Sequence, residues 1–137
     1  MLDAKTIQKY KSWKLSKLLK EVERLVNAFV RKRDSLYNGQ YFKCISCDNV
    51  KQMSQCNAGH YFSVGNYGAV RFNLDNIHAQ CIHCNFRLHG NLIPYRENLI
   101  KKIGIERFEH LEMLAHSNFK YDRLVLIDII EKFKNSA

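Results

Sequence analysis

Apolar residues recur at helical spacing along the first quarter of the chain. Between Thr6 and about Leu36 they stand three or four positions apart, and lysines fill most of the positions between them. The pattern predicts one long amphipathic helix, or two, with a basic outer face and an end at Asn38-Gly39. Core packing best explains the apolar stripe, although a dimer contact would use the same pattern.

The helical period disappears between residues 40 and 78. Two short β-type runs, 60–64 and 69–72, flank the turn-forming sequence GNYG. They predict a β-hairpin, followed at Asp75-Asn76 by a turn. A short helix is then expected from about Ile82 to His89, stopped by Gly90.

Helical spacing returns around Pro94, which suits the first turn of a helix. One helix is expected to stop at Gly104, a second to cover Ile105 to about His116, and a third to run from about Asp122 to Lys134. The sequence therefore predicts an α+β fold in three parts. These are a basic helical arm at 1–39, a core at 40–92 and a helical segment at 93–137.

The charge is distributed unevenly. The 137 residues carry a net charge of +9, and residues 1–40 hold ten Lys/Arg against four Asp/Glu. A basic arm favours nucleic acid as a partner, although a solvated basic surface explains the charge equally well. There is no secretory signal, and the longest apolar run, 124–130, is too short to cross a bilayer. The prediction is a soluble cytoplasmic protein without a membrane partner.

Four of the five cysteines form two CxxC pairs, Cys44/Cys47 and Cys81/Cys84. A CxxC turns two thiolates toward one ion, and two such pairs complete a tetrahedral Zn²⁺ site. The sequence therefore predicts a structural zinc. The fifth, Cys56, is expected to be a small buried residue.

A second set of metal-binding and proton-accepting groups consists of His60, Asn76, Asn85 and His89. In a helix, positions i and i+4 share one face, so Asn85 and His89 can present donors to one ion. A neutral His60 can take a proton from water, and a divalent ion can polarise a phosphate. The set indicates metal-assisted phosphodiester hydrolysis, whereas His83, between the zinc cysteines, is expected to point elsewhere. Simpler roles remain open: a packed histidine, a turn asparagine and a helix-capping His89.

The chain carries, in order, the segments CISC, AGHYF, RFNLDNIHAQCIHCN, HGN and YRENLIKKIG. In this order they resemble the phage NinG (Rap) family of recombination endonucleases, over roughly residues 22–115. The resemblance implies a structure-selective DNA endonuclease that hydrolyses phosphodiester bonds in branched recombination intermediates, in the host cytoplasm.

The same residues resemble the broader HNH, or ββα-metal, nuclease pattern. That resemblance implies a zinc-braced ββα-metal core with a long N-terminal helix and C-terminal helices. It makes His60 the catalytic base, Asn76 the residue that orients it, and Asn85 and His89 the ligands of a Mg²⁺ or Mn²⁺. Many such proteins have a metal-binding Asp or His directly before the base, where this chain has Gly59.

Six basic side chains are expected to contact DNA: Lys14, Lys17, Arg31, Arg33, Arg71 and Arg87. A homodimer would suit the cutting of both strands of a junction. Two other functions remain open. One is a non-catalytic zinc-stabilised module that binds DNA or RNA, which Gly59 favours; the other is a scaffold that uses the N-terminal helix.

Overall fold

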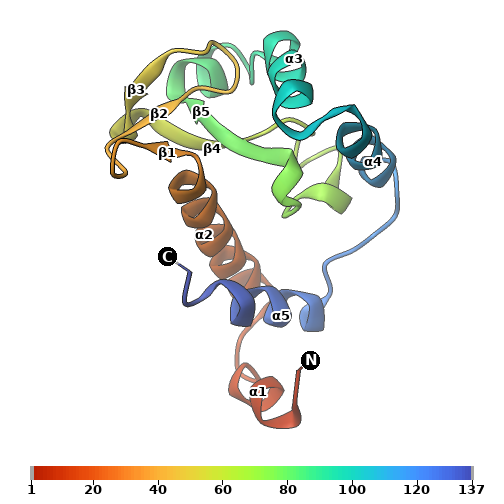
Figure 1. The fold of residues 1–137 in the computed structure, drawn as a ribbon. Coiled ribbons are helices and arrows are strands. Elements are labelled where there is room, and N and C mark those ends of the chain that lie inside the picture. The colour runs from red at the N-terminus through yellow and green to blue at the C-terminus, as the bar shows by residue number, and fades with distance from the viewer. Residues whose placement is uncertain (1, 137) are drawn as a thin grey trace.

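The computed structural model describes residues 2–136, which form a mixed α+β fold (Figure 1). The β4–β5 hairpin runs between a pair formed by α2 and α5 and a pair formed by α3 and α4. The helices are α1 (Ala4–Lys9), α2 (Leu15–Arg33), α3 (Leu92–Ile103), α4 (Ile105–Ala115) and α5 (Arg123–Phe133). The strands are β1 (Ser35–Leu36), β2 (Tyr41–Lys43), β3 (Val50–Gln52), β4 (Cys56–His60) and β5 (Ile77–Cys81).

The predicted N-terminal helix is two helices, and it ends earlier than expected. The chain leaves α2 at Arg33, because residues Ser35–Leu36 pair with β2 as an edge strand. The buried stripe of α2 packs against α5 and against Ile77 of the hairpin. The apolar pattern is therefore core packing, as expected, and the arm shares one core with the C-terminal helix. The residues of α2 that are buried are Leu18, Val22, Leu25, Val26 and Val30.

The predicted hairpin has the wrong strands. The observed pair is β4 with β5, in antiparallel register from Cys56↔Cys81 to His60↔Ile77, and residues 61–76 form the connection. The runs 60–64 and 69–72 do not pair, because the Asn76 side chain takes the backbone hydrogen bonds of Phe62 and Val70. A single buried asparagine thus replaces a strand ladder.

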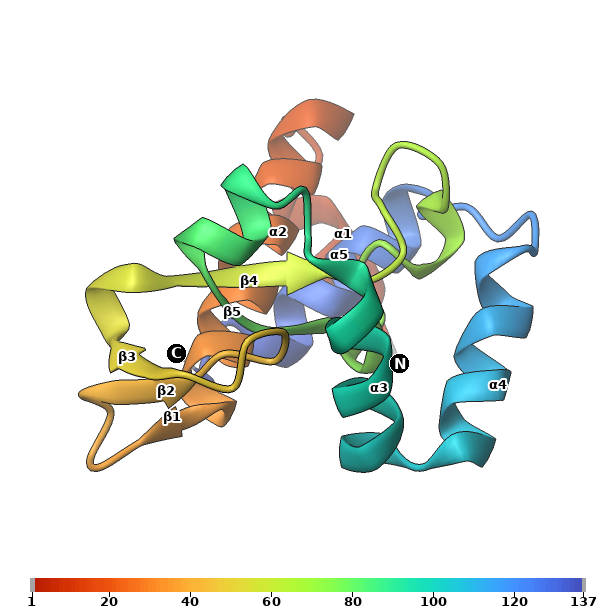
Figure 2. The ribbon, with the colours of Figure 1, turned by 90° about the horizontal axis from the view of Figure 1, so that it is seen from above.

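The helix expected after β5 is a five-residue π-helix, His83–Arg87 (Figure 2, green helix following β5). The N–H of Leu88 bonds the carbonyl of His83, five residues back, instead of the four of an α-helix. The next residues, His89 and Gly90, have φ values of 52° and 95°, so the helix stops there. The short helix was predicted correctly, but its type was not.

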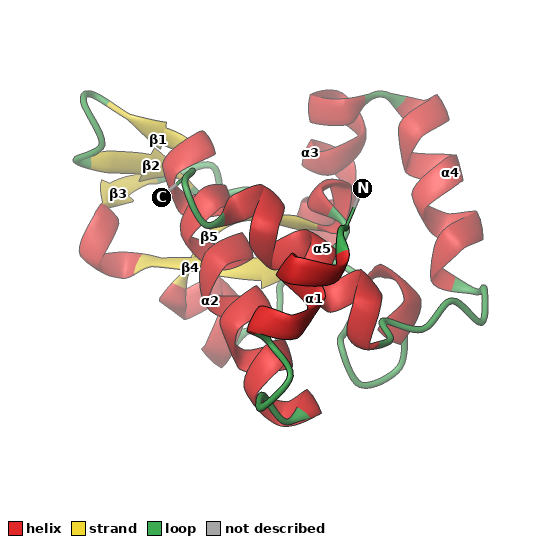
Figure 3. Cartoon of the chain, turned by 90° about the horizontal axis from the view of Figure 1, so that it is seen from below, coloured by secondary structure: helices red, strands yellow, loops and turns green. Residues whose placement is uncertain are grey.

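The three C-terminal helices confirm the predicted boundaries to within a few residues. Gly104 ends α3 with φ 89°, and the side chain of Asp122 caps α5 by accepting from the N–H of Val125. Seen from below, α1, α2 and α5 lie together, and α3 and α4 form a pair beside them (Figure 3). Among the helices of residues 2–136, none has the length and apolar character needed to cross a membrane.

Candidate functional site

Two turns bring four thiols together beside the hairpin. The sulfur atoms of Cys44, Cys47, Cys81 and Cys84 all lie within 4.8 Å of one another. With Zn–S bonds of about 2.3 Å, tetrahedral geometry separates sulfurs by roughly 3.8 Å. The Sγ atoms of Cys47 and Cys81 lie 3.9 Å apart. The pairing of the two CxxC turns is confirmed, and this four-cysteine cluster could hold a metal ion such as zinc.

Backbone N–H groups already point at these sulfurs. The N–H groups of Cys47 and Cys81 donate to Cys44 Sγ at 3.5 and 3.3 Å, and that of Cys84 donates to Cys81 Sγ at 3.4 Å. Burial raises the pKa of the Cys81 thiol, but hydrogen bonds from Cys84 and the neighbouring thiols outweigh it and lower the pKa to about 7. Burial instead raises the pKa of the Cys44 thiol, and raises that of Cys84 to about 12. Among these three cysteines, the surroundings favour thiolate, the form that binds zinc, at Cys81 alone.

Cys56 lies outside this cluster. It is buried in the apolar contacts around Phe42, and burial raises its pKa to about 11. A thiol of this kind is inert packing, so the expectation of a small buried residue is confirmed.

A cavity of about 280 Å³ collects three of the predicted site residues. His60 from the end of β4, Asn85 from the π-helix and His89 from the following turn all line it. Helical spacing was the reason for pairing Asn85 with His89, yet His89 lies beyond the helix in a left-handed conformation. The turn, and not helical periodicity, brings the two residues to one wall. His83 is exposed and does not line this cavity, as expected.

The ring of His60 is fixed by a backbone carbonyl. Its Nε2 lies 2.8 Å from the carbonyl oxygen of Arg71. Since a carbonyl can only accept, Nε2 carries the proton and the lone pair of the neutral ring is on Nδ1. Burial lowers the pKa of His60 and outweighs the contribution of the Arg71 carbonyl, so the neutral form prevails near pH 7.

Asn76 acts on His60 indirectly. Its side chain is fully buried, accepts from the N–H of Phe62 at 2.8 Å, and donates to the carbonyls of Phe62 and Val70 at 3.0 and 3.2 Å. Val70 directly precedes Arg71, whose carbonyl holds the His60 ring. The orienting role that the resemblance implied for Asn76 would therefore act through Val70 and the Arg71 carbonyl.

Comparison with known proteins identifies the family of this chain. The family model described as "Bacteriophage Lambda NinG protein" matches residues 2–137. The chain belongs to the phage NinG family. Over 94 residues it is 42% identical to Protein ninG of Escherichia phage lambda, and 40% identical to those of Salmonella phage P22 and Escherichia phage 933W. These alignments cover 69% of this chain but only 43–44% of each relative, so the chain spans less than half of their length. No solved structure matches it.

In this NinG-family chain, position 59 has no space for a metal-binding side chain. A Cβ atom on Gly59 would lie 2.0 Å from Oε1 and 2.9 Å from Cβ of Gln80, which is fully buried. An Asp or His at this position would displace Gln80. The glycine is therefore explained by the side chain opposite it on β5.

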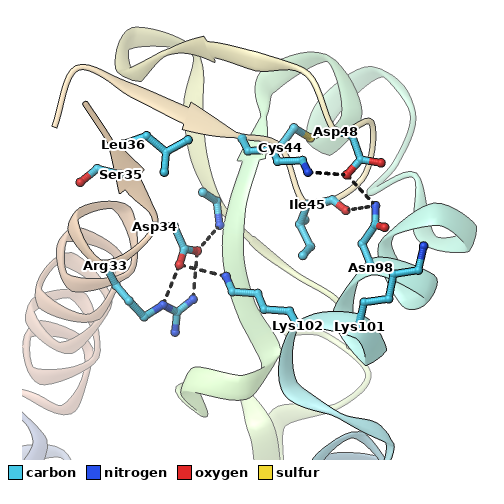
Figure 4. A pocket seen from close by; sticks show the side chains of 12 residues that line it. Arg33, Asp34, Ser35, Leu36, Cys44, Ile45, Asp48, Asn98, Lys101 and Lys102 are labelled. Carbon is cyan, nitrogen blue, oxygen red and sulfur yellow. Dashed lines mark hydrogen bonds and ion pairs between the residues drawn. The ribbon is translucent and has the colours of Figure 1, made fainter. Parts of the chain in front are cut away.

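A charge cluster around the largely covered carboxylate of Asp34 was missed by sequence reasoning. Asp34 lies between Arg33 and Lys102 in a cavity of about 400 Å³ (Figure 4), and Lys102 Nζ also lies 2.8 Å from His78 Nδ1. Burial opposes ionisation of Asp34, but the two cations and the N–H of Ala79 hold its pKa well below the usual range. The sequence of β5 contained one signal of polar residues at this place, because His78 and Gln80 alternate with apolar residues. In the structure both faces of the strand are buried.

Arg33 was expected to contact DNA, and its guanidinium also has partners within the fold. Its guanidinium donates to Asp34 and to the carbonyls of Leu74 and Ile77, at 2.7–3.1 Å. These contacts join the end of α2 to the start of β5. Arg33 therefore supports the fold through these hydrogen bonds, and its contact with DNA stays a prediction.

The other five basic residues remain predicted DNA contacts. Lys17 lies over the Trp13 ring at 4.0 Å, and Arg71 pairs with Glu23 at 3.4 Å. Lys14 and Arg87 are exposed, and Arg31 lines a surface hollow together with Lys20 and Arg24. Positive charge therefore follows α2. Arg71 also bonds His60 through its backbone carbonyl, and Arg87 stands two residues after Asn85 on the π-helix.

Proposed function

We propose that this NinG-family chain is a metal-dependent DNA endonuclease of the ββα-metal (HNH) type. The proposal depends on one observation: His60, Asn85 and His89 line a single cavity beside a cysteine cluster suited to zinc. A β-hairpin followed directly by a short helix is also the order of elements that the ββα name describes.

His60 is the proposed general base. The Arg71 carbonyl holds Nε2–H, which leaves the Nδ1 lone pair available, and burial keeps the ring neutral near pH 7. A neutral imidazole can take the proton of an attacking water and hold it at Nδ1. Asn76 keeps the loop that carries the Arg71 carbonyl in place.

Asn85 and His89 are the proposed ligands of Mg²⁺ or Mn²⁺. They offer oxygen and nitrogen donors on one wall of the cavity, a set that suits a hard ion which keeps several waters. When bound, the ion would polarise the scissile phosphate and stabilise the leaving oxygen. Since Gly59 adds no ligand, the protein contributes few donors of its own to this site.

DNA is the proposed substrate, in branched form by resemblance to the family. Lysines and arginines along α2, together with Arg71 and Arg87, would supply phosphate contacts that do not depend on sequence. A homodimer would allow both strands of a junction to be cut.

The alternative is a zinc-stabilised nucleic-acid-binding module without catalysis. The observation that favours it is the Gly59–Gln80 contact, because it leaves no space for the side chain that completes the metal site in many HNH proteins. Both functions would use the same basic surface, so only a cleavage assay separates them.

The test is incubation of the purified chain with synthetic four-way junctions and Mg²⁺ or Mn²⁺. A His60→Ala variant loses the base, and a His110→Ala variant, exposed on α4, serves as the matched control. We expect cleavage by the wild type and the control, and a loss of 100-fold or more, on the order expected for a general base, in His60→Ala. Binding without cleavage under both ions would support the alternative, and equal cleavage by His60→Ala would refute the mechanism.

A further inference from the structure

A buried hydrogen-bond network joins the cysteine cluster to the turn that carries His89. The Gln80 amide Nε2 donates to the Gly90 carbonyl at 2.6 Å and to Ser46 Oγ at 2.9 Å. Ser46 Oγ in turn donates to the same Gly90 carbonyl at 3.2 Å. Ser46 lies between the zinc-type cysteines of the first CxxC, and both Ser46 and Gln80 are excluded from solvent.

The turn is also tied to the second CxxC. The N–H of Gly90 donates to the carbonyl of Cys84 at 2.9 Å, and Asn91 Nδ2 lies 3.5 Å from Cys84 Sγ. His89 itself has φ 52°, a conformation that a residue with a side chain adopts only when its surroundings hold it there. Gly90 is therefore held by residues of both CxxC segments and by Gln80, and it restrains His89, which directly precedes it.

Gln80 can occupy this position only because residue 59 is glycine. The carboxamide oxygen lies where a side chain at position 59 would begin, and it has no hydrogen-bond partner within the described residues. A buried oxygen without a donor is unfavourable. The side chain therefore owes its orientation to its two donated hydrogen bonds, toward Gly90 and Ser46.

We propose that Gln80 is a positioning residue of the divalent-metal site, linking the four-cysteine cluster to His89. The proposal rests on the proposed function, since that function assigns the divalent ion to Asn85 and His89. Gly59, which replaces a ligand of the HNH pattern, then has a role of its own: it leaves the space in which Gln80 holds the ligand turn.

Two substitutions on different strands should therefore have one effect. Gln80→Ala removes the donors to Gly90, and Gly59→Ala places a methyl group where the Gln80 oxygen lies, which forces the carboxamide to move. An alanine at position 80 would keep the Cβ atom that lies 2.9 Å from the added methyl group, so the double variant combines Gly59→Ala with Gln80→Gly. There the space is empty, and Gly59→Ala should add little to Gln80→Gly. Removal of groups that orient metal ligands typically weakens metal binding 10–100-fold.

The experiment measures Mn²⁺ binding to the zinc-loaded full chain by electron paramagnetic resonance of the free ion. We expect Gln80→Ala and Gly59→Ala each to weaken binding by about 10-fold or more, with about one zinc per chain retained. The double variant Gly59→Ala/Gln80→Gly should match Gln80→Gly alone. His110→Ala is the control. The Mn²⁺ concentration for half-maximal junction cleavage should rise in parallel, whereas the rate at saturating Mn²⁺ should change only a few-fold.

Mn²⁺ affinity within twofold of wild type in zinc-loaded Gln80→Ala would overturn the proposal, as would additive losses in the double variant. Where Gln80→Ala fails to retain zinc, Ser46→Ala, which keeps the Gln80–Gly90 bond, provides the test. It should weaken Mn²⁺ binding by less than Gly59→Ala does, and the reverse order would count against the network. Failure of the proposed function can be told apart from failure of this proposal, because it would appear in the wild type. The wild type would then show neither cleavage nor any Mn²⁺ binding that depends on His89.

Discussion

Replacing Asn76 with alanine should destabilise the fold strongly, because this side chain holds the loop between β4 and β5. The change removes three buried hydrogen bonds at once, one to the N–H of Phe62 and two to the carbonyls of Phe62 and Val70. A buried backbone group left without a partner costs about 1–3 kcal/mol. Partial entry of water reduces the sum for three groups to about 3–5 kcal/mol. That is a large share of the roughly 5–15 kcal/mol of a typical domain.

The assay is urea unfolding of the zinc-loaded protein, supported by the melting temperature, which should fall by roughly 10–20 °C. Asn66→Ala, an exposed position in the same connection, is the control and should change the free energy of unfolding by less than about 0.5 kcal/mol. Asn76→Asp should be no better than Asn76→Ala at pH 7, because a carboxylate would face two carbonyl oxygens. A loss below about 1 kcal/mol in Asn76→Ala would refute the view that this side chain replaces a strand ladder.

Three further predictions concern metal, pH and salt. Chelation of the metal should unfold the core, and metal analysis of protein purified without chelator should give about one zinc per chain; a stable, metal-free fold would contradict this. Burial and the neighbouring Lys102 lower the pKa of His78 to about 3, so the unfolded chain binds a proton that the folded chain rejects. Unfolding free energy should therefore fall as pH drops from about 6.5 toward 3, and urea titrations should show a smaller fall in His78→Asn. Arg87→Ala should reduce the slope of log affinity for DNA against log salt concentration by about 1, measured by anisotropy; an unchanged slope would remove Arg87 from the interface.

Local pattern was enough to predict the helices and the cysteine pairing. The apolar stripe of α2 and the boundaries of α4 and α5 follow from helical spacing, and two CxxC turns have few other uses. The hairpin was misplaced because residues 60–72 alternate like a strand, although a side chain 14 positions beyond Phe62 takes their backbone bonds. No short-range signal reports such a contact.

The charge cluster and the Gln80 network were missed for the same physical reason. Asp34 meets Lys102 across 68 residues, and Gln80 meets Ser46 across 34. Each residue alone is compatible with an exposed surface, and only the tertiary fold covers the Asp34 carboxylate and Gln80 and supplies their partners. The candidate cavity was found more easily, because His60, Asn85 and His89 lie in segments whose order could be compared with a known family.

The π-helix explains why two metal sites would need to lie so close together. A helix of five residues is far below the length at which helices are stable in water, so its ends must hold it. Cys84 fixes one end through the four-cysteine cluster, and the carbonyl of Gly90 fixes the other through Gln80 and Ser46. Asn85, the next residue after a cluster ligand, inherits its orientation from that ligand, and His89 inherits its orientation from Gly90. Occupancy of the cysteine cluster should therefore raise the affinity of the second site, and by thermodynamic linkage an ion bound there should raise the zinc affinity by the same factor.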